Sequence, residues 1–294
     1  MMPSPGVVID AHHHFWDPST ADYPWLTGPL EPIRRRFDPD DLRPELEANG
    51  VSGTILVQTR SSLAETREFL ETAERTRFVV GVVGWVDLTE PDVLDVLREL
   101  RLHPGGERLV GVRHQVHDEP DPDWLRRDDV RRGLHAVQQA GLTFDLLVRP
   151  RELLAALDTV RALPLLRFVI DHIAKPPIAS GELEPWASLI APFGELPNVF
   201  CKVSGMVTEA DWQKGWTVDD LRPYVDHVLE VFGPKRLLFG SDWPVCLVAG
   251  SYGRVIGASK ELFAGLTEAE HGKVFAATAR RVYRLPDALV ESLR

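Results

Sequence analysis

The sequence predicts an α/β protein of the (β/α)8 class, a TIM barrel formed by residues 1–294 as a single domain. Eight short apolar runs lack polar alternation, which is typical of strands buried on both faces of a parallel sheet. Segments with helical periodicity lie between them, at about 37 residues per strand–helix unit. An open doubly wound sheet usually carries a G-x-G-x-x-G turn after its first strand. The sequence has none, so a closed barrel is favoured.

The predicted strands are runs rich in Val, Ile, Leu and Phe. Each is three to nine residues long, which suits a strand better than a helix. In chain order they are Val7–Ile9, Thr54–Val57, Phe78–Val86, Leu109–Val116, Phe144–Val148, Leu166–Ile170, Val199–Val203 and Leu237–Phe239.

The predicted helices repeat apolar residues every three or four positions. Two of them begin with capping-box spacing, Ser62 with Glu65 and Thr267 with Glu270. In chain order they are Asp40–Asn49, Ser61–Arg75, Glu90–Leu100, Arg127–Ala140, Arg151–Leu163, Glu182–Phe193, Thr217–Phe232 and Thr267–Leu285. This regular alternation, without a linker-like shift in composition, predicts one domain.

Composition excludes several classes of protein. The chain has 33 basic and 44 acidic residues, a net charge of −11, which disfavours nucleic-acid binding. The longest apolar run, Val79–Val86, is far shorter than the roughly 20 residues of a membrane span. Met1–Pro5 lacks the features of a signal peptide. Cys201 and Cys246 lie in apolar segments, which favours buried thiols over a disulfide, and therefore a cytoplasmic protein.

The first strand runs into three consecutive histidines. Alternate residues of a strand point to the same side, so His12 and His14 should share the barrel interior while His13 points away. Two such imidazoles could hold a divalent metal or polarise a carbonyl group. A surface loop or a tag-like run is the alternative, disfavoured by the apolar strand before it and by Phe15 and Trp16 after it.

Two further residues at strand ends fit the same site. His172 follows the sixth apolar run; alone it would more often be a structural histidine, but the histidine pair favours a shared site. Asp242 follows the eighth run, where an unpaired buried carboxylate would be costly. Opposite histidines it could act as a general base on water. The alternative is a turn-capping Asp before Pro244.

Cationic residues also occupy strand ends. Arg113 and His114 end the fourth run, Arg149 follows the fifth, and Lys202 lies in the seventh. They suit an oxygen-rich or anionic substrate, or an oxyanion. Each could equally be a structural ion-pair partner.

Aromatic residues lie near the same strand ends. Trp16, Trp25 and Trp243 could contact the apolar face of a sugar ring, although ordinary core packing explains any single one equally well. The G-x-S-x-G, H-E-x-x-H and G-x-x-x-x-G-K motifs are absent, so covalent serine or cysteine catalysis is poorly supported.

These motifs together resemble the amidohydrolase superfamily, and within it the lactonase-like branch, amidohydrolase family 2. The stretch from Lys202 to Trp243, with Glu209 and Trp212, is most similar to the L-fuconolactonase group. The matching segments, in order, are IDAHHHFWD at 9–17, YPWL at 23–26, GVRH at 111–114, DHIAKP at 171–176, CKVSG at 201–205 and FGSDWP at 239–244.

The resemblance implies an enzyme that opens a sugar-acid lactone, such as L-fucono-1,5-lactone, with water. Asp242 would activate the water, and the scissile carbonyl would lie among His12, His14 and His172. The implied substrate contacts are Arg113, His114, Arg149 and Lys202, with Trp16, Trp25 and Trp243 as aromatic candidates. A lactone is an activated ester, so no cofactor is strictly required.

A metal and three other activities remain open. His12, His14, His172 and Asp242 could form a site for one divalent ion, Zn or Mn. A two-metal centre is not expected, because the fourth strand offers Arg113 instead of a bridging lysine. A dicarboxylate lactone, such as 2-pyrone-4,6-dicarboxylate, could be gripped by Arg113 and Arg149. A metal-dependent decarboxylase would usually have a histidine in place of Arg149. A non-catalytic binding protein is the third alternative; the oligomeric state is not predicted.

Overall fold

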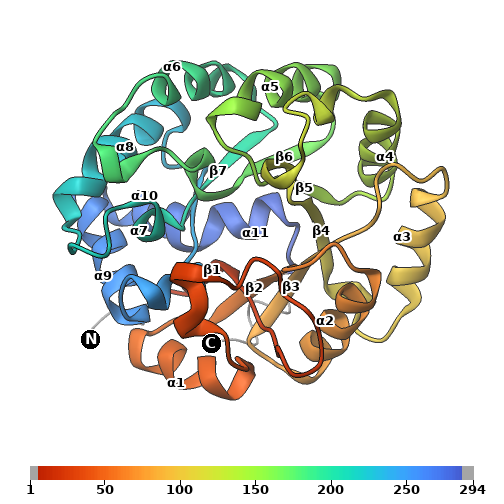
Figure 1. The fold of residues 1–294 in the computed structure, drawn as a ribbon, viewed down its shortest axis with the longest axis horizontal. Helices are drawn as coiled ribbons and strands as arrows, with labels where there is room; N and C mark the ends of the chain where they lie inside the picture. Colours follow the sequence, from red (N-terminus) through yellow and green to blue (C-terminus); the bar gives the residue numbers. More distant parts are fainter. Residues whose placement is uncertain (1–5, 287–294) are drawn as a thin grey trace.

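The computed structural model describes residues 6–286, so the signal-peptide prediction for Met1–Pro5 lies outside the described residues. Eight parallel strands form one sheet in the order of the sequence. The first and last strands meet where His13 pairs with Trp243, and the backbone N–H of His14 donates to Trp243 O at 2.7 Å. Helices surround this ring of strands (Figure 1), which confirms the predicted (β/α)8 barrel.

Seven strands begin within one residue of the start of a predicted run, and the first begins two residues later than predicted. The predicted run Val7–Ile9 ends too early. Strand β1 starts at Ile9 and continues to His13, where it still pairs with β2. The strands are β1 (Ile9–His13), β2 (Gly53–Val57), β3 (Val79–Gly84), β4 (Leu109–His114), β5 (Thr143–Leu146), β6 (Arg167–Ile170), β7 (Val199–Val203) and β8 (Leu237–Phe239).

The helices differ from prediction mainly in the last third of the chain. The α-helices are α1 (Pro39–Asn49), α2 (Leu63–Arg75), α3 (Val93–Leu102), α4 (Asp128–Gln139), α5 (Leu153–Ala162), α6 (Trp186–Ile190), α7 (Met206–Glu209), α8 (Val218–Phe232), α9 (Tyr252–Leu262), α10 (Glu268–Gly272) and α11 (Thr278–Val282).

Two predicted helices need correction, and two helices, α7 and α9, were not predicted. Glu182–Phe193 contains the short α6 and the start of a 3-10 helix, Ala191–Glu195, rather than one α-helix, because Pro185 and Pro192 cannot donate helical backbone hydrogen bonds. Helix α9 was not predicted; two glycines weaken its local helix propensity, and burial of Tyr252 and its neighbours compensates. Thr267–Leu285 is α10, a π-helical turn and α11 rather than one helix.

Only one of the two predicted capping boxes forms. Thr267 and Glu270 cap α10 reciprocally. At α2, Ser62 accepts from the backbone N–H of Glu65, but the Glu65 carboxylate instead accepts from the backbone N–H groups of Thr59 and Arg60.

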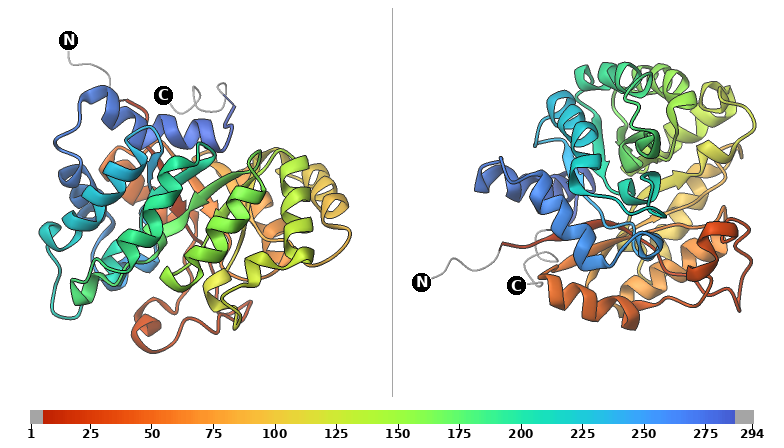
Figure 2. Two further views of the ribbon diagram at one scale, coloured as in Figure 1. Left: turned by 90° about the horizontal axis from the view of Figure 1, so that it is seen from above. Right: turned by 60° about the vertical axis from the view of Figure 1, so that its left-hand side comes forward.

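The barrel interior is apolar at one end. Residues that point inward from the strands, including Ile9, Ala11 and Leu238, pack against Val282 and Tyr283 at the C-terminal helix. Helix α11 crosses the barrel in Figure 1, and the left view of Figure 2 shows it at the end opposite the segment that joins β1 to α1. The C-terminal helix therefore closes the end of the barrel that lies away from the histidines.

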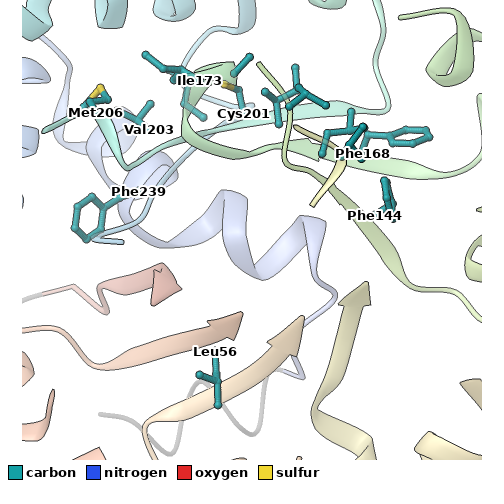
Figure 3. Close-up of a cluster of buried hydrophobic side chains, with 14 of the residues drawn as sticks. Leu56, Phe144, Phe168, Ile173, Cys201, Val203, Met206 and Phe239 are labelled. Carbon is teal, nitrogen blue, oxygen red and sulfur yellow. The ribbon is translucent and has the colours of Figure 1, made fainter. Parts of the chain in front are cut away.

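A second set of apolar residues packs between the strands and the surrounding helices. Phe144 and Phe168 pack edge to face, and Cys201 lies near Ile173 and Val203 in the same cluster (Figure 3). Cys201 and Cys246 are both buried and free, as predicted. Within residues 6–286, no helix has the length and apolar character needed to span a membrane.

Candidate active site

A β-bulge in β1 aims two histidines into the barrel. The pairing register with β2 shifts between Asp10 and His13. Ala11 packs into the interior cluster, and the next residue, His12, also points inward, which a regular strand would not allow. His12 Nε2 lies 3.2 Å from His14 Nε2, whereas His13 Nε2 meets Thr54 Oγ1 at 2.8 Å. The prediction that His12 and His14 share a side is confirmed.

The remaining two members of the predicted set lie in left-handed backbone. His172 to Lys175 form four successive residues with φ between 46° and 61°, and Asp242 has φ 59°. Such conformations are unfavourable for residues other than glycine and often mark functional sites. The indole of Trp186 donates to Ile173 O at 2.7 Å, and Asp242 N donates to His12 O at 2.8 Å, which holds both segments in place.

The four side chains converge around one carboxylate oxygen. Asp242 Oδ1 lies 3.3 Å from His14 Nε2, 3.7 Å from His12 Nε2 and 3.9 Å from His172 Nε2. Ligand atoms of His12, His172 and Asp242 all lie within 4.8 Å of one another. Ligands of a tetrahedral zinc are separated by about 3.4 Å. The donor set therefore fits a single divalent cation.

Hydrogen bonds on the far nitrogens orient two of the rings. His14 Nδ1 lies 2.8 Å from Val57 O, a pure acceptor, so Nδ1 carries a proton, and Nε2 faces the site. His172 Nδ1 lies 2.9 Å from Ser204 Oγ, which can donate or accept. Such outer partners are typical of metal-binding histidines.

Burial sets the protonation states of these groups. Burial lowers the pKa of His12 and of His172 well below 6.5, although nearby carboxylates oppose it. Burial alone would raise the pKa of Asp242, but the proximity of His172 and a hydrogen bond from His14 outweigh it and bring the pKa below 3.8. Near neutral pH the site therefore combines an ionised carboxylate with neutral imidazoles at His12 and His172.

A buried ionic network lies beneath the histidines. Lys202 Nζ contacts Asp145 Oδ2 at 2.6 Å and Asp171 Oδ1 at 2.9 Å. Arg113 Nη1 contacts Asp171 Oδ2 at 3.0 Å, and the Tyr283 hydroxyl donates to Asp145 Oδ2 at 2.7 Å. The two cations and two carboxylates balance in charge. Sequence reasoning gave no role to Asp145, Asp171 or Tyr283, because each is a single residue within an otherwise apolar or familiar motif.

His12 connects this network to the site. Its Nδ1 lies 3.3 Å from Lys202 Nζ and 3.5 Å from Asp171 Oδ1, and its Nε2 lies 3.2 Å from Arg113 Nη1. Arg113 and Lys202 are thus adjacent to the site but buried below it. Their predicted role as substrate contacts stays a prediction.

Two other predicted contacts lie further out. His114 is held by Trp85 Nε1 at 3.1 Å and by Glu119 at 2.7 Å, and it stacks on Trp124. Arg149 is 46% exposed and faces Glu209. Neither side chain touches the four converging residues in the contacts of residues 6–286.

The predicted tryptophans form part of an aromatic cluster. Trp16 and Trp243 are buried, and each packs edge to face on Phe37, at 5.5 and 5.3 Å between ring centroids. Trp25 is half-buried, and its indole nitrogen has no hydrogen-bond partner among the described residues. That nitrogen is itself buried, and contact of all three tryptophans with substrate stays a prediction.

Comparison with known proteins places this geometry in context. The pattern described as "Amidohydrolase" matches residues 9–285. A protein from Burkholderia ambifaria named L-fucono-1,5-lactonase is 43% identical over 83% of each chain. One from Burkholderia multivorans with the same name is 37% identical over 95% of this chain and 96% of that one. A crystal structure of a B. multivorans amidohydrolase with bound Zn superimposes with a TM-score of 0.90, at 37% identity, covering 95% of this chain and 100% of that one.

Proposed function

The chain belongs to the amidohydrolase family, and we propose that it is a hydrolase that opens the ring of a sugar-acid lactone, L-fucono-1,5-lactone or a close relative. The proposal rests on one observation above all. An ionised, buried Asp242 carboxylate lies within 3.9 Å of three histidine nitrogens at the strand ends of a barrel. The two similar lactonases support the choice of substrate class.

The proposed reaction begins with proton transfer from water to Asp242. The hydroxide adds to the lactone carbonyl and forms a tetrahedral oxyanion. Collapse breaks the ring C–O bond, and the departing alkoxide takes the proton from Asp242. The product is an open-chain hydroxy acid, and the carboxylate base is regenerated.

His172 can stabilise the oxyanion through its tautomer. When the Ser204 hydroxyl donates to Nδ1, Nε2 carries hydrogen and can donate to the developing charge. When that hydroxyl instead accepts from Nδ1, Nε2 has a free lone pair. Ser204 therefore permits both a hydrogen-bonding role and a ligand role for His172.

We propose that His12, His14, His172 and Asp242 can hold one divalent ion, zinc or manganese. A bound cation would polarise the lactone carbonyl and stabilise negative charge on its oxygen. The zinc-bound relative and the convergent donor atoms support this site. The reaction also has its base and hydrogen-bond donor in the side chains alone.

A neutral lactone is favoured over a dicarboxylate. Arg113 is engaged by Asp171 and by both oxygens of Gln58, and Arg149 faces Glu209. Neither guanidinium is presented without a partner, as gripping a substrate carboxylate would require. The decarboxylase alternative gains no support from Arg149 either, because such an enzyme would usually have a histidine in its place.

The test is proton release from a panel of L- and D-aldonolactones in weak buffer, with and without chelator. We expect stereoselective turnover, and a loss of at least 1,000-fold in kcat for Asp242→Asn. Asparagine tolerates the left-handed conformation at this position, so the backbone should survive, which a thermal melt would verify. No turnover above background on any lactone would overturn the proposal.

A further inference from the structure

Three side chains from consecutive strand ends meet beside the proposed site. Arg149 follows β5, Lys175 follows β6, and Glu209 ends α7 after β7. Glu209 Oε1 accepts from Lys175 Nζ at 2.7 Å, and its Oε2 lies 3.5 Å from Arg149 Nη1. The Lys175 and Glu209 side chains are only 15% and 16% exposed. One carboxylate therefore engages two cations in a partly desolvated position.

The charges of this cluster reach the reacting groups. Lys175 belongs to the same left-handed turn as His172. Burial raises the pKa of Asp242, whereas His172, His14 and also Lys175 lower it. Lys175 therefore belongs to the electrostatic surroundings of the site, and Arg149 contacts the carboxylate that Lys175 binds.

Glu209 supplies the carboxylate that both cations of this cluster contact. Burial raises the pKa of Asp118, and Arg149 and Lys175 are the largest influences that oppose this rise. Removal of the Glu209 charge would leave an excess positive charge where a substrate approaches.

We propose that Glu209 is a specificity-determining residue that makes the site select neutral lactones over lactones bearing a carboxylate. It does so in two ways. It occupies Lys175 and Arg149, which would otherwise attract an anion, and it repels a substrate carboxylate directly. The inference rests on the proposed lactonase function and adds the reason why an anionic lactone would be a poor substrate.

The experiment compares Glu209→Gln with wild type on one neutral and one anionic substrate. The substrates are L-fucono-1,5-lactone and D-glucaro-1,4-lactone, whose second carboxylate stays ionised. A unit charge at this range in partly screened surroundings corresponds to roughly a fivefold to tenfold effect. We expect the anionic-to-neutral ratio of kcat/KM to rise by about that factor, mainly through KM, and the rise to shrink in high salt.

Two further variants isolate the charge effect. Glu209→Gln combined with Arg149→Gln should bring the ratio back towards wild type, because the excess positive charge is removed. Glu47→Gln on α1 changes the net charge equally at an exposed position and should leave the ratio unchanged. Calorimetric titration with D-glucarate provides a readout independent of turnover, with tighter binding expected for Glu209→Gln.

The outcomes separate this inference from the proposed function. An equal loss on both substrates, with unchanged glucarate affinity, would overturn the role of Glu209 while leaving the lactonase intact. If wild type hydrolysed no lactone but Glu209→Gln gained affinity for glucarate, the lactonase function would be wrong. The role of Glu209 in excluding anions would still stand. If Glu209→Gln gained no affinity for glucarate and left the anionic-to-neutral ratio of kcat/KM unchanged, the proposed role of Glu209 would be wrong.

Discussion

Lys202 Nζ lies 2.9 Å from Asp171 Oδ1 in the middle of the barrel, and neither side chain is exposed to solvent. A buried ammonium is costly unless opposite charges surround it. Asp145 supplies the second charge, and the same ammonium lies 3.3 Å from His12 Nδ1. The ion pair therefore lies directly below the proposed catalytic residues and supports the ring that faces Asp242.

We expect Lys202→Met to destabilise the protein by about 3–5 kcal/mol, since it leaves Asp145 and Asp171 buried without their shared counter-charge. The free energy of unfolding in urea measures this loss. The double variant Lys202→Met with Asp145→Asn should recover part of it, because one of the uncompensated charges is gone. Equal stability of Lys202→Met and wild type would contradict a structural role for the pair.

Gly205→Ala should displace His172. A Cβ at this position would lie 2.4 Å from His172 Nδ1, and φ is 62°. We expect lactone turnover to fall by at least tenfold, together with a loss of stability. Gly181→Ala is the matched control, because φ is 71° there but nothing lies within 4 Å of the added Cβ. It should cost only about 1 kcal/mol of stability and leave turnover intact. Similar turnover in both variants would count against the steric argument.

The barrel and its four converging side chains were predictable from sequence for simple reasons. Buried parallel strands produce continuous apolar runs, and strand alternation places His12 and His14 on one side. Asp242 was recognisable because a carboxylate directly after an apolar run needs partners. These are properties of local sequence, and they do not depend on which distant strands become neighbours in space.

Other features depend on backbone angles or on distant contacts. The bulge in β1 and the left-handed turn from His172 to Lys175 are not encoded by residue type, since none of these positions is glycine. The pairing of Glu209 with Arg149 joins side chains that lie 60 positions apart in sequence. Helix α9 was missed because its stability comes from burial rather than propensity.

Acid should destabilise the protein through His117. Burial, followed by the charges of Lys175 and Arg149, lowers the pKa of this histidine to about 3. The Asp118 carboxylate lies 3.2 Å from His117 Nε2 and would favour a protonated His117. It is 60% exposed, so solvent screens its charge. Below pH 6.5 His117 binds a proton in the unfolded chain but stays neutral in the folded chain. Stability is therefore constant above this pH and falls as the pH drops towards 3.

The measurement is the urea midpoint of wild type and His117→Gln between pH 7 and pH 4. Between pH 7 and pH 5 we expect the free energy of unfolding of wild type to fall by up to about 2 kcal/mol more than that of the variant. A proton that binds only to the unfolded chain contributes about 1.4 kcal/mol per pH unit. At pH 7 the two proteins should show the same pH slope. Parallel curves over the whole range would mean that His117 titrates normally in the folded state.

Ser204→Ala should weaken the site without changing any of the four converging residues. The variant removes the only hydrogen-bond partner of His172 Nδ1 in the contacts of residues 6–286, so the ring loses the hydrogen bond that orients it. We expect kcat to fall by about 10- to 100-fold, and zinc affinity, measured by competition with a chelating dye, to fall by a similar factor. Ser259→Ala is the control, because that buried hydroxyl donates within α9 to Val255 O at 3.0 Å, away from the site. If Ser204→Ala matched Ser259→Ala in both assays, His172 would be oriented by packing alone. The tautomer switch proposed for it would then be wrong.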